Sequence, residues 1–485
     1  MTDFDQLHVV SDLHLGGSIG FQIFDQSKEL AGLVDYLKAL SAPHLGLVLN
    51  GDVVDFLAED DPKYLDPNGA VRKLDRIFAD LTFAPVWQAL SRFVSTEGRE
   101  LIIVGGNHDV ELSLPPVRQR LIEQLCGGAS DARGRITLAT DGAGFACTVR
   151  GARVLCIHGH EADPWNVVDY RQLLEVERAL NRRQPPPEWT PNAGTKLVID
   201  LMNDVKQSFP FVDLLKPETP VVPSVVLAVD RQVVSKLNNL APVLLRLASD
   251  QVRLRLGLLG ADEPEAALTI SDDAAMQHLL AKGFSRAAQG SGDLDDLLGR
   301  VEDQWQKGED PTSLVTGGGA ETLGLPGMLI DRVLGRDPRD NLREALQSWL
   351  GDDRTFETNF ADDTFRRLDA DVGREVAFVV AGHTHLQRAL PRSSRVGAYF
   401  NSGTWIRLIK LSSAHLQHAA SFDPVFLALK AGTMQALDQL EGLVVRRSTV
   451  VSIEPDSRSV FGELRYMRLE PETKLEPVPN TRLGV

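Results

Sequence analysis

Five short apolar runs in this chain each lead into a cluster of Asp, Asn or His residues. A short apolar run indicates a buried strand, so these polar residues lie at strand carboxyl ends. In an α/β sheet, ligands gather outside those ends. The pattern therefore predicts one polar site built from five strands. The five motifs are Asp12-Leu13-His14, Gly51-Asp52-Val53-Val54-Asp55, Gly106-Asn107-His108-Asp109, His158-Gly159-His160 and Gly382-His383-Thr384-His385.

Helical spacing separates the strands in the first 160 residues. Leu30, Leu33 and Leu37 recur at helical intervals, and residues 71–96 also have helical character. Strands that alternate with helices predict a layered α/β fold. The expected strands of this part are residues 7–10, 45–49, 101–104, 136–150 and 152–157.

The middle of the chain has a different pattern of apolar and polar residues. Leu197, Val198 and Leu201 fall on one face of an expected amphipathic helix, whereas residues 252–258 fit either a helix or a strand. Strands return at 376–380 and 396–400, and residues 443–469 predict a hairpin that turns at 455–457. We therefore expect three segments: a core part over 1–162, a mainly helical inserted cap over 163–373, and a second core part over 374–485.

Composition limits the class of protein. A hydrophobic fraction of 43% and a charged fraction of 24% are typical of a soluble globular chain. Three cysteines are too few for a disulfide framework, and they have no C-x-x-C spacing. The sequence has no export signal and no apolar stretch of membrane-spanning length, so we expect a cytoplasmic protein without a transmembrane segment. The net charge of −16 does not exclude an anionic substrate.

The motif residues are suited to divalent metal ions. Carboxylate, imidazole and amide oxygen donors fit Mn, Fe or Zn, and thiolate ligands are missing from the set. Asp12 and His14 stand two residues apart, so both can reach one ion where the strand opens into a loop. A carboxylate such as Asp52 can bridge two ions about 3.5–4 Å apart. The ligands are too many for one ion, so the sequence predicts two.

The five motifs in this order resemble the signature of the calcineurin-like metallophosphoesterase superfamily. The recognisable parts are residues 1–161 and 374–405. The resemblance implies a layered mixed β-sheet sandwich flanked by helices. It also implies hydrolysis of a phosphodiester, phosphomonoester or pyrophosphate bond by a hydroxide that bridges two divalent ions, with Mn favoured.

The resemblance assigns a role to each motif residue. His108 would protonate the leaving oxygen or stabilise the transition state, and Asp55 would orient it. Asn107 would also contact the substrate. His160 would either contact the substrate phosphate or form a hydrogen bond within its loop, two interpretations of equal weight. The implied ligands are Asp12, His14, Asp52 and His385 for the first ion, and Asp52, Asn107, His158 and His383 for the second.

Other polar residues have structural interpretations. Asp109 braces its loop, Trp405 belongs to the core, and residues 401–404 form a turn near the metals. Gly317-Gly318-Gly319 lacks a following Gly-Lys-Ser/Thr and is interpreted as a loop without a phosphate-binding role. The histidines without a motif are expected to be structural or solvent-facing; they are His8, His44, His278, His415 and His418.

A long insertion separates the fourth and fifth motifs, with 222 residues between His160 and His383. Because both ends are tied to predicted ligands, the insertion is expected to emerge beside the site as a cap or lid. The branch that cleaves UDP-2,3-diacylglucosamine also has a helical lid here, which suggests a lipid-linked substrate. This chain departs from that branch at His108 and His160. Residues 209–212 and 225–227 fit an acyl groove or, preferably, the insertion's own core.

Three alternatives remain open at this point. A nuclease is disfavoured because the sequence has no Lys and Arg cluster for a phosphate backbone, so the expected substrate is a small-molecule or lipid-linked phosphate ester. A non-catalytic metal-binding scaffold is disfavoured because every motif position is filled. The insertion is also compatible with peripheral membrane contact. The sequence does not indicate an oligomeric state.

Overall fold

The fold divides into two compact units in a computed structural model. The first unit comprises Met1–Gln207, Arg354–Arg407 and Val445–Val485, and the second comprises Ser208–Asp353 and Leu408–Val444. The structure describes residues 1–18, 21–164, 166–216, 225, 228–229, 337–351, 353–393 and 397–485.

The first unit contains a mixed eight-stranded sheet, in the order β16-β15-β14-β2-β3-β4-β5, with β17 paired to β15. The strands β2 to β5 run parallel, and β14 joins them antiparallel to β2. Every residue of β3 is buried, as expected for a central parallel strand covered on both faces. The strands are β2 (Gln6–Val10), β3 (Leu45–Asn50), β4 (Arg99–Val104), β5 (Ile136–Ala139), β14 (Thr449–Pro455), β15 (Val460–Arg468), β16 (Lys474–Pro477) and β17 (Leu483–Gly484).

A six-stranded sheet, in the order β1-β6-β7-β9-β11-β10, completes the first unit. Its centre is parallel, because β7 pairs with β9 and β9 with β11 in the same direction. The strands are β1 (Asp3–Phe4), β6 (Phe145–Val149), β7 (Ala152–Cys156), β9 (Phe378–Ala381), β10 (Gln387–Pro391) and β11 (Ala398–Ser402).

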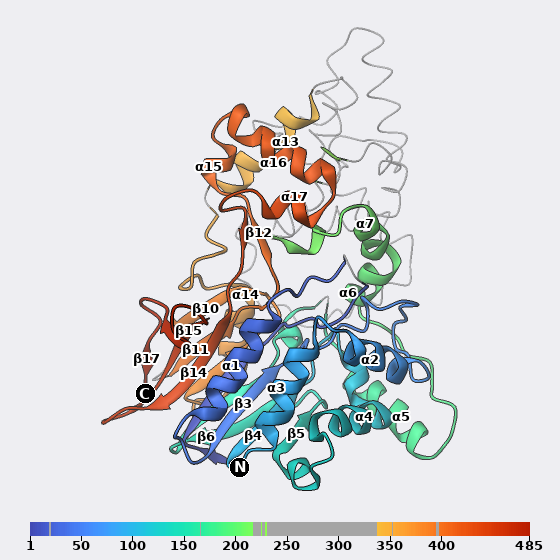
Figure 1. Ribbon diagram of the computed structural model, residues 1–485, viewed down its shortest axis with the longest axis vertical. Coiled ribbons are helices and arrows are strands. Elements are labelled where there is room, and N and C mark those ends of the chain that lie inside the picture. Colours follow the sequence, from blue (N-terminus) through green and yellow to red (C-terminus); the bar gives the residue numbers. More distant parts are fainter. Residues whose placement is uncertain are drawn as a thin grey trace. The chain divides into compact units, whose positions relative to one another are not determined.

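The two sheets share one hydrophobic core. Val9 and Ile102 of the larger sheet belong to the same buried cluster as Phe378 and Phe400 of the smaller one. Helices α1 (Ser27–Ala39) and α3 (Ala84–Val94) cover the outer face of the larger sheet (Figure 1). On the smaller sheet, Phe365 of α14 (Asp363–Asp371) packs in a second cluster. The result is a β-sandwich flanked by helices, as the family resemblance implies.

Among the other helices of this unit, α4 begins and ends at residues suited to those positions. Helix α4 starts at Pro115, which needs no backbone hydrogen-bond donor there, and stops at Gly127, whose φ of 54° is left-handed. The helix expected around Leu197 is present, but residues 198–202 form a π-helix within it. These helices are α2 (Ala70–Ala79), α4 (Pro115–Cys126), α5 (Tyr170–Asn181), α6 (Ala193–Leu197) and α7 (Asn203–Ser208).

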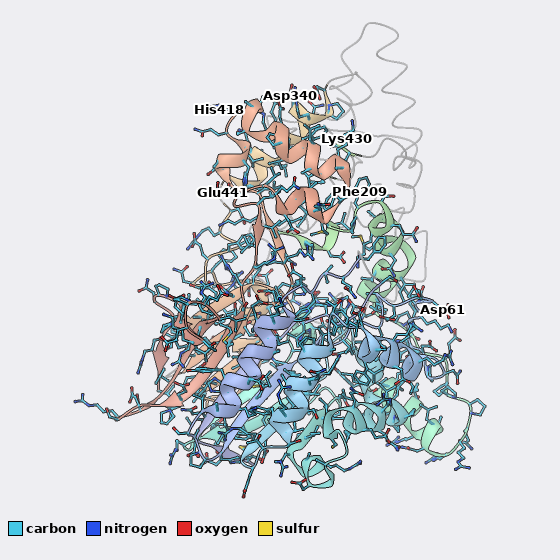
Figure 2. The ribbon with its side chains drawn as sticks, in the orientation of Figure 1. Asp61, Phe209, Asp340, His418, Lys430 and Glu441 are labelled. Atoms are coloured by element: carbon cyan, nitrogen blue, oxygen red, sulfur yellow. The ribbon has the colours of Figure 1, made fainter. Side chains whose placement is uncertain are left out.

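In its described residues the second unit is mainly helical. It contains α13 (Pro338–Leu350), α15 (Ser413–Leu416), α16 (Ala419–Ala431) and α17 (Met434–Asp438), and β8 (Leu215–Lys216) pairs in parallel with β12 (Leu408–Lys410). Phe209, labelled in Figure 2, is buried and its ring lies 5.9 Å from that of Phe211. The residue 209–212 stretch is therefore core, as the sequence favours.

Several expectations on the chain's organisation can be compared with these elements. The C-terminal hairpin is confirmed, with Asp456 donating its N–H to Ser459 O at the turn between β14 and β15. The boundaries of the two compact units differ from those of the three expected segments. Residues 408–444, which are expected in the second core part, group with the second unit. The cap stays a prediction. Residues 252–258, Gly317-Gly318-Gly319 and His278 lie outside the described residues, as do two of the three residues in 225–227.

Candidate metal centre

The five motifs follow strands of both sheets, whereas the sequence only predicts strand ends that converge. Asp12, Asp52 and Asn107 come after β2, β3 and β4 of the larger sheet. His158 and His383 come after β7 and β9 of the smaller sheet. The site is therefore built where the parallel centres of the two packed sheets end together.

Asn50 connects the two sheets at this end. Its side-chain Nδ2 donates to Ile157 O at 3.0 Å and to Val380 O at 3.2 Å, both on the smaller sheet. Its own carbonyl oxygen lies 2.8 Å from Nδ1 of His158. A carbonyl only accepts, so in the neutral His158 ring the proton sits on Nδ1 and Nε2 is the electron-pair donor.

Asp12, His14 and His385 form the first cluster of candidate ligands, with one ligand atom from each lying within 4.8 Å of the others. The Nε2 atoms of His14 and His385 are 3.2 Å apart, and His385 Nε2 is 3.4 Å from Asp12 Oδ1. Two imidazole nitrogens and a carboxylate oxygen that face one another in this way suit a divalent cation between them.

Asp12, Asp52 and His158 form a second cluster of the same kind. Asp52 Oδ2 lies 3.2 Å from His158 Nε2 and 3.7 Å from His14 Nε2. Asn107 contributes a side-chain Oδ1 that is buried and has no hydrogen-bond partner among the described residues. A buried acceptor of this kind costs free energy unless something satisfies it, and a cation would do so. Asp52 therefore stands between two sets of donors.

Asp55 links two of the motif histidines. Its Oδ1 lies 3.3 Å from Nδ1 of His108, and its Oδ2 lies 3.1 Å from Nδ1 of His14. The contact with His108 agrees with the orienting role that the resemblance implies. The contact with His14 is additional. These three residues also form a cluster with ligand geometry, but the hydrogen bonds already account for their proximity.

His383 and His160 lie beside these clusters. The backbone N–H of His383 donates to both carboxylate oxygens of Asp12, at 3.0 and 3.1 Å, while its ring Nε2 contacts Asp163. The ring of His160 is fully buried, and its Nε2 lies 2.9 Å from the hydroxyl of Tyr170. Burial and this hydrogen bond favour the structural interpretation of His160 over substrate contact.

The clusters concentrate negative charge. Burial alone would raise the pKa of Asp52, but the charges of His158 and His108 hold that pKa well below its ordinary value. Burial opposes protonation of His158, yet Asp52 raises its pKa to about 10. Likewise, burial lowers the pKa of His108 but Asp55 raises it to about 9. The carboxylates therefore attract positive charge, which protons or metal ions can supply.

The backbone is strained at the candidate ligands. Nine described non-glycine residues have positive φ, and five of them are Asp12, His14, Asp52, His383 and His385, at 49–67°. This left-handed conformation is unfavourable for residues with a Cβ, although Asp, Asn and His tolerate it better than most. Backbone hydrogen bonds hold it, including Leu13 N–H to Asp52 O at 2.9 Å and Gly382 N–H to His158 O at 2.7 Å. Strain of this kind clusters at functional sites.

Three glycines let the loops approach the ligands closely. A Cβ on Gly106 would overlap Asp52 Oδ1, and one on Gly51 would overlap the His158 ring. A Cβ on Gly382 would lie 2.6 Å from Asp12 Oδ2. Only glycine therefore fits at these motif positions.

Residues 6–211 match the family model of the calcineurin-like phosphoesterases. This part of the chain is a calcineurin-like phosphoesterase domain. Proteins of this family are metal-dependent hydrolases of phosphoesters, and the donor clusters above fit that requirement. The match contains the first four motifs. The fifth motif lies beyond it, but its His385 completes the first cluster.

Two other results bear on the class of enzyme. A search of curated proteins returned no match, so the resemblance to the UDP-2,3-diacylglucosamine branch stays a prediction. Within the described part of the chain, no helix has both the length and the apolar character that a bilayer span requires.

The remaining motif-based interpretations can now be judged. Asp109 is buried and accepts the N–H groups of Val53 and Gly106 at 2.8 and 2.6 Å, so it braces the loops as predicted. Trp405 is fully buried and is confirmed as core. Of the histidines without a motif, His8 is buried against Ser452 and His418 is exposed (Figure 2).

Sequence reasoning missed four residues around the clusters. Asn50 follows an apolar run directly, but its partners lie on the other sheet and leave no local signal. Ser11 bonds to Asp12 and, at 2.6 Å, to Ser402. Lys206 of α7 lies near enough to His108 for its charge to oppose protonation of that ring. Asp163 contacts a predicted ligand from just beyond the fourth motif.

Proposed function

We propose that this metallophosphoesterase uses two divalent ions to hydrolyse a small phosphate ester. The position of Asp52 Oδ2 carries the proposal. It lies between His158 Nε2 and His14 Nε2, which stand in different predicted ligand sets. A carboxylate in that position is suited to bridging two ions.

The proposed ligand sets follow from these contacts together with the family resemblance. The first ion would be held by the Asp12, His14 and His385 cluster with Asp52 as the shared ligand. The second would be held by Asp52 and His158, with the unpartnered Oδ1 of Asn107 and an imidazole nitrogen of His383. Two bound ions would supply Lewis-acid polarisation of the phosphoryl group and activation of water.

The chain's own acid would be His108. Asp55 holds its Nδ1 and raises its pKa against the effect of burial, so the ring carries a proton at neutral pH in the metal-free site. The ring is 20% exposed, in contrast to the buried rings of His14 and His158. A protonated and accessible imidazole can donate its Nε2 proton to a leaving oxygen. Lys206 adds positive charge beside it, which suits an anionic substrate.

The proposed substrate is a phosphate ester small enough to enter this site. We infer that the insertion selects the leaving group, because both of its ends adjoin His160 and His383. The cleaved bond is a diester, monoester or pyrophosphate, and manganese is the proposed ion. A nuclease remains the alternative of the same chemistry.

The test is a substrate screen on the full chain. The protein is stripped of metal with EDTA, reconstituted with Mn²⁺, Fe²⁺ or Zn²⁺, and assayed on p-nitrophenyl phosphate, bis-p-nitrophenyl phosphate, UDP-glucose and duplex DNA. We expect metal-dependent turnover of at least one small ester and negligible cleavage of the duplex. Preferential cleavage of DNA would favour the nuclease. No turnover of any ester with any of the metals would favour the non-catalytic scaffold.

A further inference from the structure

Asp163 contacts His383, a predicted ligand that belongs to none of the three donor clusters among the described residues. Its Oδ2 lies 3.0 Å from Nε2 of His383, across 220 positions of sequence. The main chain of His383 is fixed separately, by the two hydrogen bonds from its N–H to the Asp12 carboxylate. The His383 ring is therefore held both at its backbone and at Nε2.

The Asp163 carboxylate is itself held in place. Its N–H donates to His160 O at 3.0 Å, and its Oδ2 accepts from Nδ2 of Asn166 at 2.7 Å. Asn166 is anchored in turn, because its carbonyl accepts from Nδ2 of Asn192 at 3.1 Å, and Asn192 caps α6 through Thr195 N–H at 2.7 Å. A chain of hydrogen bonds thus runs from His383 to the first turn of a helix in the insertion.

The chemistry of this contact determines the state of the imidazole. An ionised carboxylate only accepts hydrogen bonds, so Nε2 of His383 carries a proton. A neutral imidazole has one N–H, and Nδ1 is then left with the lone pair that a metal ion requires. Histidine ligands usually donate their other N–H to a carboxylate or carbonyl, which fixes the tautomer and makes the ligand more basic.

We propose that Asp163 is a positioning residue that holds His383 as a neutral imidazole with Nδ1 as the ligating nitrogen. The inference rests on the proposed two-metal function. It assigns a task to a residue outside the five motifs, and it connects the second ion to the start of the insertion through Asn166 and Asn192. Asp163 acts through His383 and does not touch the substrate.

The experiment measures metal binding in the full chain. Free Mn²⁺ is followed by its electron paramagnetic resonance signal during titration of metal-free wild type and Asp163→Asn. Asparagine keeps the size of the side chain but removes the charge. The Asn oxygen can still accept from His383 and Asn166, so this variant removes the negative charge and keeps the hydrogen bonds. We expect one of two Mn²⁺ affinities to fall about 10–100-fold, the usual effect of mutating such a carboxylate, while the other is unchanged. At saturating Mn²⁺, kcat should recover to within a few-fold of wild type.

Asp169→Asn is the matched control. Asp169 lies six residues further on, is exposed, and caps α5 by accepting Gln172 N–H at 3.0 Å. It should bind both ions as wild type does. Unchanged binding in Asp163→Asn as well would overturn the inference, as would an equal loss in both variants.

A second variant covers the case in which Asp163→Asn does not fold. Asn166→Ala removes only the side chain that anchors the Asp163 carboxylate, and the same Mn²⁺ affinity should fall several-fold. Wild-type binding in this variant would then overturn the inference. Failure of the proposed function has a different signature, because wild type itself would bind fewer than two Mn²⁺ or hydrolyse no ester.

Discussion

Replacing Asp55 by Asn should disturb the first ion more than it disturbs the predicted acid. The two carboxylate oxygens of Asp55 have unequal tasks. Oδ1 accepts from the N–H groups of Leu57 and Ala58, both at 3.1 Å, and from His108 Nδ1 at 3.3 Å. Among the described residues, Oδ2 contacts Nδ1 of His14 alone, at 3.1 Å.

The amide of Asn can satisfy only one of these sides. With the Asn oxygen at the Oδ1 position, the N–H groups of Leu57, Ala58 and His108 keep their acceptor. In the flipped orientation all three would face the NH₂ group, which is another donor. An unsatisfied buried donor costs about 1–3 kcal/mol, so two more of them disfavour the flipped orientation by about 2–6 kcal/mol. The amide NH₂ of Asp55→Asn should therefore face His14 Nδ1.

This orientation reverses the tautomer of His14. Its Nδ1 must accept a hydrogen bond, so the single ring proton moves to Nε2. That nitrogen is the one that lies 3.2 Å from His385 Nε2 in the first cluster, and a protonated nitrogen cannot ligate a cation. We expect an Mn²⁺ affinity to fall at least about 10–100-fold, because the same change reverses a ligand as well as removing its partner.

His108→Gln separates the two roles of Asp55. This variant keeps the contact between Asp55 and His14, so both Mn²⁺ ions should bind normally while kcat falls about 10²–10⁴-fold, as expected for loss of a general acid. Mn²⁺ titration and kcat on the best ester from the screen give both numbers. If Asp55→Asn binds two Mn²⁺ with wild-type affinity and loses only kcat, Asp55 serves His108 alone and the reasoning is refuted.

Three further outcomes are expected. EDTA should abolish hydrolysis, and activity should return as two Mn²⁺ per chain are added; full activity at one ion would contradict the two-metal proposal. Gly106→Ala should destabilise the fold and reduce metal binding, because its Cβ would overlap Asp52 Oδ1, whereas Gly134→Ala has open space and should melt like wild type in calorimetry. Burial lowers the pKa of His8 to about 4 in the folded chain, so on acidification the unfolded chain binds the proton first. The stability that the neutral His8 contributes is therefore present above pH 6.5 and is lost as pH falls toward 4. Between pH 7.5 and 5, urea unfolding should show wild type losing about 2 kcal/mol more than His8→Gln, and parallel curves would contradict this.

The strands and their polar ends were predictable from sequence because both signals are local. Apolar runs such as residues 45–49 end abruptly in charged residues, and the order of the motifs supplied the family. The family resemblance implied the contact between His108 and Asp55, which the structure shows at 3.3 Å.

Partners across the sandwich were not predictable. No periodicity tells which of two sheets a strand joins, so the link from Asn50 to Val380 left no trace in the sequence. The second contact of Asp55 joins two loops of the same sheet, and its partner His14 lies 41 positions away. Asp163 looked like an ordinary loop residue because its partner is 220 positions away. The left-handed backbone at Asp12 and His383 was also hidden, since neither is a glycine.

The left-handed backbone at the five candidate ligands has a consequence for the stability of the fold. Glycine would relieve the left-handed conformation at Asp12, His14, Asp52, His383 and His385, each of which costs about 1–3 kcal/mol. Selection for a durable fold alone would thus erode the centre toward glycine, one ligand at a time. Asp and His stand at all five positions in spite of that cost, and each supplies a donor atom that glycine would remove.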